Sequence, residues 1–589
     1  MKAIGGFVVL GMLNDQQDLA VGAISIARHE TSLCMFVSIG VGAREAGSFL
    51  WISFILAALA CGISGLCYCE MSSLVPVAGS AYSYVYTILG ELPAAIVGFV
   101  LCVDSSISAA AVARAFAAYV NVLLGEKLPK ILYDYDLGSS ENLWSISLLS
   151  FLLCLLLGLL LYRGIRQTST FNNWSTILNM AVILVFIVGG FVFFRSDIWH
   201  PTTPEGIVRG SGRVFFAYLG FDVINCLAEE TTEARRLVPR AIIITIVICC
   251  VVYVLVAVAF VHLAPLASVS MDAPLATAFE ARGATVLEFV VSLGAVGNTM
   301  TSVMSSMIVQ PRIMLRMSSD GLLPEAIGRL TSSGTPSTAL IITIVMSSAL
   351  ALVIDFEALA DIVSFGALLS FLAVCLCTML GRVVPPSVYR QRAAASQQPQ
   401  EYGKPDANGA PAAAKNSRAS AQLRPHYPRE ILLMVLFFEV ATLVFGALFL
   451  HDLVSIFFYL PLLIICLFAG IATSRVVRTY FNYTDLGDGN EDPLTKPFRV
   501  PGAPEVPLAG MFINTYMISG LPFAAVLRGL AVMLVAITFY FAYSIRNSNL
   551  AASGETAVQK MDGKIAGRYV NFENDDDSTS LDGDTEDVI

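Results

Sequence analysis

The feature that most constrains the fold of this chain is a series of apolar runs long enough to cross a membrane. A helix needs about 20 apolar residues to span the roughly 30 Å hydrocarbon core of a bilayer. About fourteen such runs recur along the chain, and the first, at 18–41, is interrupted by polar residues. The others lie near 50–69, 92–122, 143–162, 174–194, 206–228, 240–263, 286–311, 336–354, 358–381, 430–450, 453–474, 504–519 and 522–545. The pattern predicts an all-α, polytopic membrane protein.

Composition supports this class and argues against several others. Of the 589 residues, 56% are hydrophobic and 14% are charged, too few polar groups to cover a soluble surface. The 12 cysteines lie mostly singly within apolar runs, without metal-ligand spacing, so no metal or other cofactor is predicted. Five dispersed histidines offer no nucleophile–base pair, and no enzyme is predicted. Much of the net charge of −10 lies in the C-terminal tail, and no nucleic-acid partner is expected.

Changes in composition divide the chain into five parts. Residues 1–48 hold the N-terminus and the interrupted first run, and 49–382 hold spans two to ten of a core. Residues 383–429 have no hydrophobic period and predict a disordered cytoplasmic connector. Residues 430–547 hold four further spans. The acidic segment 548–589 predicts a disordered tail that could bind a cytosolic partner.

The distribution of basic residues predicts the orientation in the membrane. Lysine and arginine gather in alternate gaps between the runs: 163–172, 229–240, 312–335, 382–429 and 475–500. Cytoplasmic loops are the ones enriched in these residues. Both termini are therefore expected in the cytoplasm, with the protein in a plasma membrane or a vacuolar or lysosomal membrane.

One apolar run, 206–228, contains a predicted break. Its sequence FFAYLGFD ends in Gly220, Phe221 and Asp222. Glycine lets the backbone leave helical geometry, and an ionised carboxylate at membrane depth costs at least a few kcal/mol. Backbone groups freed by such a break are tolerated only where they line a cavity, and in secondary transporters they hold the substrate. The alternative is an ordinary helix in which Asp222 is buried and satisfied.

Four stretches in the same order resemble one family. They are GISGLCYCEMSSLVPVAGSAYSYVY (62–86), FFAYLGFD with the following EE and VP (215–239), TSVMSSMIVQPRIMLRMSSDGLLPEAI (301–327) and KPFRVPGAPEVPLAGMFINTYM (496–517). They resemble the amino acid–polyamine–organocation superfamily, and the last resembles its cationic amino acid transporter branch. The resemblance implies a LeuT-like core, with spans one to five and six to ten as inverted repeats and spans one and six unwound at the midplane. Four extra C-terminal helices complete the predicted fold.

The same resemblance implies transport of amino acids by alternating access, with cationic substrates such as arginine, lysine and ornithine favoured. The α-ammonium group would bind carbonyl oxygens freed at Phe216, Ala217 and Tyr218, with Tyr218 and Phe221 beside the side-chain pocket. The predicted substrate-binding residues are Phe216, Ala217, Tyr218, Gly220, Phe221, Asp222, Asp104, Ser32 and Cys34. The alternatives are a permease for neutral amino acids or polyamines, or an amino acid sensor that does not transport.

Asp104 is a second acidic residue within a predicted span, where relatives carry a glutamate. A carboxylate facing the cavity would attract a cationic side chain. Arg114 lies ten residues further along the same helix, about 15 Å away, which is too far for direct contact. A role for Asp104 in a structural network is the alternative.

Three further residues bear on coupling and gating. Proton-coupled relatives carry a lysine at the position aligned with Asn179, and a neutral amide cannot titrate. This implies facilitated uniport or exchange, with the membrane potential supplying about 2.3 kcal/mol per 100 mV to a cationic substrate. Ser364 and Gly366 are expected to allow close helix approach and movement of a gate.

Two features depart from the family pattern. Arg28 to Ser32 occupies the place of a glycine-rich break whose N–H groups bind the substrate carboxylate in relatives. Three explanations stay open: a divergent site that uses Arg28 or Thr31, a loss of transport, or an incorrect gene model for residues 1–34. In addition, Arg213 at the mouth of the sixth span would repel a cationic substrate unless it is paired.

Overall fold

A computed structural model describes residues 35, 38–75, 79–136, 145–163, 169–198, 201–221, 234–270, 273–330, 336–383, 428–450, 456–480 and 498–548. This described part of the chain is mostly helical. The predictions for Ser32, Cys34 and Asp222, for the connector within 384–427 and for the tail from 549 onward lie outside these residues.

The helices follow the apolar runs closely. In the first half they are α3 (Leu50–Leu74), α4 (Ala81–Ile88), α5 (Glu91–Leu123), α6 (Lys130–Tyr133), α7 (Leu148–Tyr162), α8 (Ser169–Val192), α9 (Pro204–Val214) and α11 (Ala234–Val261). In the second half they are α12 (Pro274–Glu280), α13 (Thr285–Ser319), α14 (Ser337–Val353), α15 (Phe356–Gly381), α18 (Arg429–Leu450), α19 (Ile456–Thr479), α20 (Glu505–Ser519), α21 (Phe523–Phe539) and α22 (Ile545–Asn547).

Short irregular elements complete the described chain. Three 3₁₀ segments are η2 (Gly47–Phe49), η3 (Phe215–Tyr218) and η5 (Leu266–Ser268), and a π-helical turn, η7 (Tyr540–Ser544), joins α21 to α22. The strands β1 (Tyr135–Asp136) and β2 (Ser145–Ile146) form one antiparallel pair.

Eight helical segments among the described residues are long and apolar enough to cross a membrane. Their exposed side chains fit that environment: Phe468 on α19 is 71% exposed and Leu433 on α18 is 65% exposed. A row of such groups is unfavourable in water but ordinary against lipid tails. The helical and apolar chain therefore fits the predicted class of polytopic membrane protein. The inverted repeats and the total of about fourteen spans stay predictions.

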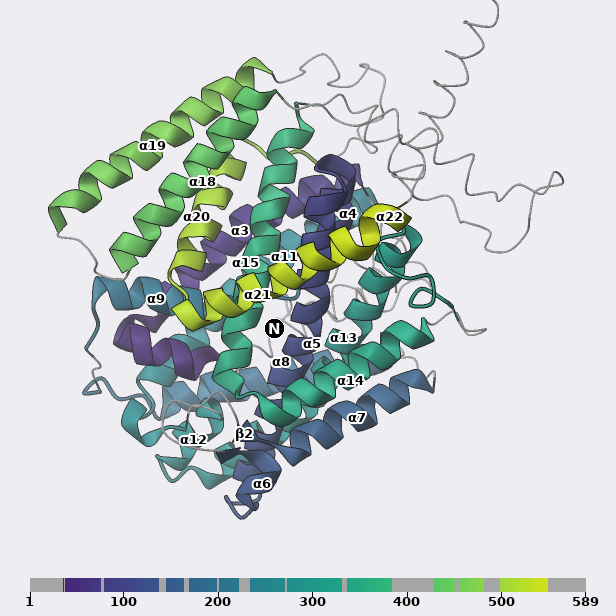
Figure 1. Ribbon diagram of the computed structural model, residues 1–589. Coiled ribbons are helices and arrows are strands. Elements are labelled where there is room, and N and C mark those ends of the chain that lie inside the picture. Colours follow the sequence, from purple (N-terminus) through teal and green to yellow (C-terminus); the bar gives the residue numbers. More distant parts are fainter. Residues whose placement is uncertain are drawn as a thin grey trace, which may run out of the picture.

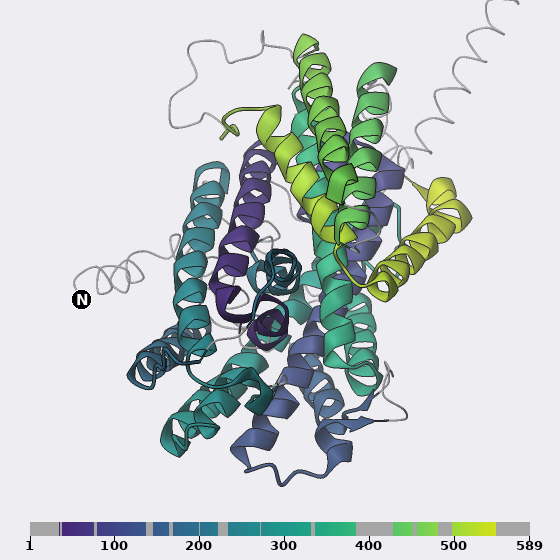
Figure 2. The same ribbon diagram turned by 90° about the vertical axis from the view of Figure 1, so that its left-hand side faces the viewer.

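The C-terminal helices pack on the core in two separate places. Figure 1 shows α18, α19 and α20 side by side, and α20 packs directly on α15 and α3. α21 instead packs across α5 and α15 (Figure 1), and Figure 2 shows this yellow segment at the edge of the molecule. Consequently α15 is shared by the core and by both parts of the C-terminal extension.

Candidate functional site

The predicted break is present within the run 206–228. α9 begins at Pro204, where the side chain of Thr203 accepts a hydrogen bond from the N–H of Gly206 at 3.0 Å. The α-helix ends at Val214 and continues only as the 3₁₀ turn η3. Gly220 then has a φ of +113°, a conformation that residues with a side chain rarely adopt. Glycine at this position lets the chain leave the helix axis.

Side chains of α3 and α11 supply donors to the carbonyl groups at the break. The Tyr253 hydroxyl donates to the Ala217 oxygen at 3.0 Å, and the Cys61 thiol makes a weak contact of 3.8 Å with the Tyr218 oxygen. The Tyr218 hydroxyl donates to the Phe54 oxygen at 2.9 Å and so anchors η3 to α3. Two of the three carbonyl groups predicted to bind an ammonium group thus have a protein donor, and each oxygen retains a second lone pair.

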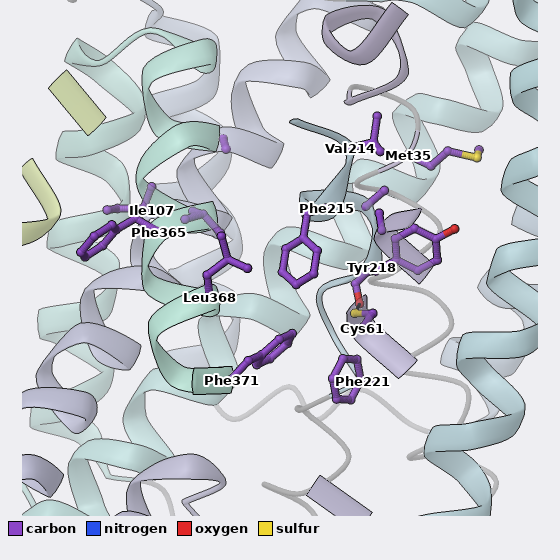
Figure 3. Packing of buried hydrophobic residues seen from close by; sticks show 14 of the residues in the cluster. Met35, Cys61, Ile107, Val214, Phe215, Tyr218, Phe221, Phe365, Leu368 and Phe371 are labelled. Carbon is purple, nitrogen blue, oxygen red and sulfur yellow. Dashed lines mark hydrogen bonds between the residues drawn. The ribbon is translucent and has the colours of Figure 1, made fainter. Parts of the chain in front are cut away.

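Aromatic rings enclose the break on the side of α15. Figure 3 shows Phe215, Phe221 and Phe371 turned toward one another, and the Phe371 ring lies 5.7 Å from Phe215 and 5.1 Å from Phe221. Tyr68 of α3 completes the cluster at 5.5 Å from Phe221 and 5.4 Å from Phe371. These separations suit edge-to-face aromatic packing. Tyr68 and Phe371 were not among the predicted residues, because aromatic residues in apolar runs are most often core residues.

A second aromatic cluster lies on the other side of η3. Tyr218 is 5.0 Å from Tyr253 and 6.3 Å from Phe54, measured between ring centroids. Tyr218 is 1% exposed and Ala217 is fully buried. The backbone of η3 therefore lies between two layers of aromatic side chains, one from α3 and α11 and one from α3 and α15.

Asp104 and Gly366, predicted separately, lie together. A methyl group added at Gly366 of α15 would lie 2.9 Å from the Asp104 Oδ1 atom on α5. Only glycine lets the α15 backbone come this close to the carboxylate without displacing it. Ser364 takes no part in this contact, since its hydroxyl donates to the Ala360 oxygen one turn earlier at 2.9 Å.

Arg114 forms a network away from Asp104. Its guanidinium group donates to the Ser145 hydroxyl at 2.7 Å and to the Ala351 oxygen at 2.8 Å, and it lies 3.4 Å from an Asp134 oxygen. It thus ties α5 to β2 and to the end of α14. This agrees with the expectation that Arg114 is too distant to pair with Asp104.

Arg213, which would repel a cationic substrate unless it is paired, has an acidic partner. Its Nη1 atom lies 2.5 Å from Oδ1 of Asp361 in α15, and the two side chains are 18% and 12% exposed. The charge at the last turn of α9 is therefore compensated. Asp361 was not singled out from the sequence, because an acid at the start of an apolar run is common at a membrane surface.

Asn179 lies in a second polar place, between α8 and α13. Asn179 and Asn298 are each 3% exposed, and among the described residues neither side chain has a hydrogen-bond partner for its oxygen or its nitrogen. A methyl group added at Gly294 would overlap Val182, so these positions face each other. Asn179 lies three residues before Val182 on α8, and Asn298 lies four residues after Gly294 on α13. Each amide is therefore one turn away on the same helix face as its neighbour. The structure therefore brings two buried amides to one level.

The predicted site residues are thus partly brought together. Ala217, Tyr218, Gly220 and Phe221 form the break itself, while the placement of the Phe216 side chain is not described. No group of three or more metal-ligating side chains occurs in the described part of the chain.

Comparison with known proteins identifies the family. Residues 19–469 match the amino acid permease family, and residues 498–548 match a family described as the C-terminus of AA_permease. The chain belongs to the amino acid permease family. The match spans the break, Asp104 and Asn179, so all the geometry above lies within the permease region.

Several curated proteins resemble this permease. It is 33% identical over 365 residues to cationic amino acid transporter 4, vacuolar, of Arabidopsis thaliana, a match covering 60% of either chain. It is 29% identical over 552 residues to cationic amino acid transporter 4 of Mus musculus, covering 87% of this chain and 84% of the mouse protein. It is 31% identical over 362 residues to the methylthioribose transporter of Bacillus subtilis (strain 168), covering 60% of this chain and 78% of the bacterial protein.

These matches confirm the resemblance to the cationic amino acid transporter branch of the amino acid–polyamine–organocation superfamily. The permease spans about three fifths of the length of the Arabidopsis relative. The names of the relatives also differ in substrate, since one is named for cationic amino acids and another for methylthioribose.

Proposed function

We propose that the permease moves amino acids across a membrane by alternating access, with arginine, lysine and ornithine favoured, and that it has no enzymatic activity. The observation that carries the proposal is the end of the α-helix at Val214, followed by η3 and the positive φ of Gly220. A membrane helix that stops among buried side chains leaves carbonyl oxygens available to a substrate.

The α-ammonium group of the substrate is assigned to the carbonyl oxygens of η3. Tyr253 holds the Ala217 oxygen in place and leaves its second lone pair for the substrate. Neutral acceptors can bind an ammonium group without an additional buried charge, which would be costly in a membrane. Phe221 and Tyr218 then pack beside the substrate as parts of the two aromatic clusters.

Charges on α5, α9 and α15 support the preference for a cationic side chain. Asp104 supplies a carboxylate beside the α15 backbone at Gly366. Asp361 compensates Arg213 in the last turn of α9, so that this positive charge does not repel the substrate.

The proposed transport is uniport or exchange. Asn179, buried at 3% exposure, carries no titratable group that could couple transport to a proton. For a cationic substrate, the membrane potential alone supplies about 2.3 kcal/mol per 100 mV. We assign residues 49–382 to the transport core and 430–547 to the added helices. The orientation has both termini in the cytoplasm, in a plasma membrane or a vacuolar or lysosomal membrane.

Uptake of radiolabelled arginine, lysine and leucine by cells expressing the whole chain tests the proposal. Two membrane potentials are compared, beside a Gly220→Ala variant and a Gly62→Ala control, because a methyl group at Gly62 meets nothing within 4 Å. We expect saturable, potential-dependent arginine uptake that Gly220→Ala strongly reduces and Gly62→Ala preserves. Absence of uptake of all three amino acids, with the protein detected in the membrane, would refute the proposal.

A further inference from the structure

The end of α3 and the end of α15 hold a backbone segment of the C-terminal extension. Glu70, 2% exposed, accepts two hydrogen bonds from Arg382, at 2.9 Å from Nε and 2.6 Å from Nη2. The N–H of Val500 donates to the same carboxylate at 2.6 Å, and Arg382 Nη2 donates to the Val500 oxygen at 2.8 Å. The backbone N–H and C=O of Val500 are therefore both held by one ion pair, in which Glu70 is buried and Arg382 is partly buried. We call Glu70, Arg382 and Val500 the clamp.

Neighbouring contacts extend the clamp along the chain. The Ser73 hydroxyl lies 3.1 Å from the Phe498 oxygen, and the Val500 side chain is 2% exposed. Deeper in the helices, Asn514 of α20 donates to the Ser64 hydroxyl at 2.9 Å. A methyl group added at Gly510 would lie 2.7 Å from the sulfur of Cys375. The extension thus follows α3 and α15 from their ends to the middle of α20.

Both clamped helices also carry aromatic side chains that enclose the break. α3 carries Tyr68, two residues before Glu70, and Tyr68 contacts Phe221 and Phe371. Phe371 belongs to α15, which ends at Gly381 beside Arg382. Separation of the clamped ends would therefore draw apart the two aromatic residues that cover η3 from this direction.

We propose that the clamp is a latch by which the C-terminal extension holds α3 and α15 closed over the break. The ion pair of Glu70 with Arg382 binds the backbone of the segment Phe498–Val500. While this segment is bound, the ends of α3 and α15 stay together and η3 is enclosed. Release of the segment lets these ends separate and opens a path from this face of the protein to η3. The latch concerns access to η3 and stands apart from the transport proposed above.

Alkylation of Cys61 measures access to the break. Cys61 lies in α3, is fully buried and contacts the Tyr218 oxygen of η3. Cys154 of α7 is also fully buried but lies outside the latch, so it reports general loosening. The purified whole protein is treated with N-ethylmaleimide, and labelling of each cysteine is followed by peptide mass spectrometry. No transport is needed, so failure of the latch and failure of the transport proposal are distinguishable.

The principal variant is Val500→Pro, which removes the N–H donated to Glu70, and its matched control is Val500→Ala, which retains it. We expect Cys61 to be labelled about tenfold faster in the proline variant than in the alanine variant. This is the factor expected when one hydrogen bond to a charged group is lost. Cys154 should keep its rate. Equal Cys61 rates in the two variants, or a parallel rise at Cys154, would overturn the latch.

A second variant keeps the test decisive if the proline variant does not fold. Ser73→Ala removes a hydroxyl that lies 3.1 Å from the Phe498 oxygen and 2.8 Å from the backbone oxygen of Glu70, and it leaves both side chains of the ion pair in place. It should raise Cys61 labelling by a smaller factor, about twofold to fivefold, for loss of a neutral hydrogen bond. An unchanged Cys61 rate in this variant would contradict the latch.

Discussion

Asp361→Asn tests whether pairing of Arg213 sets the charge preference of the permease. The Arg213 Nη1 atom lies 2.5 Å from the Asp361 carboxylate, and the substitution removes this negative charge from beside the guanidinium group. Arg213 precedes Ala217 by four residues, about 6 Å of helical rise. With the reach of its side chain, its charge lies on the order of 10 Å from a substrate at η3.

The expected effect follows from the interaction of two unit charges. At an effective dielectric constant of about 20 and a separation of about 10 Å, the repulsion is about 1.7 kcal/mol. Since about 1.4 kcal/mol corresponds to a tenfold change, the KM for arginine should rise roughly 15-fold. Leucine has no net charge, so its KM should change little.

Saturation curves for arginine and leucine uptake at one clamped membrane potential measure this difference. The control is the double variant Asp361→Asn with Arg213→Gln, which removes both charges and should restore the arginine KM. Arg213→Gln alone removes the positive charge beside Asp361 and should lower the arginine KM. An equal rise in KM for both substrates, or a rise that persists in the double variant, would show a packing effect and refute the electrostatic argument.

Three other substitutions test the packing of the site through the thermal and denaturant unfolding of the purified protein. Gly366→Ala should lower the free energy of unfolding by about 1–3 kcal/mol, because the methyl group would lie 2.9 Å from a carboxylate oxygen of α5. Gly62→Ala is the control, and equal stability of the two variants would contradict the close contact. Tyr253→Phe removes the donor to a carbonyl oxygen of η3 and should lower the free energy of unfolding by about 0.5–1.5 kcal/mol. Unchanged stability would mean that this hydrogen bond is not formed. Asn298→Leu replaces an unpartnered buried amide and should stabilise by about 1 kcal/mol; a loss would show that the amide has a bound partner.

Much of the fold could be predicted from the sequence because it depends on local chemistry. The apolar run at 92–122 became α5 and the run at 286–311 became part of α13, since a bilayer requires about 20 apolar residues per span. The break was also local: Gly220 permits a positive φ and the acid beside it disfavours a continuous apolar helix. The four motifs indicated the family for the same reason, because each is a short contiguous stretch.

The partners of the charged and polar residues could not be predicted in this way. Arg213 and Asp361 are 148 positions apart, and Glu70 and Val500 are 430 apart. Nothing local distinguishes Asp361 from another acid at a helix end, or Asn298 from the other polar residues of α13.

The sequence by itself determined which segments are apolar enough to cross a membrane, where one helix must break and to which family the chain belongs. Only the tertiary structure decided which helices meet and at what level, and hence that Asp361 neutralises Arg213 and that Glu70 and Arg382 hold the backbone of Val500. The physical reason is that hydrophobicity and backbone freedom act within one turn or one span. Pairing of polar groups instead depends on the relative height and rotation of helices that lie hundreds of residues apart.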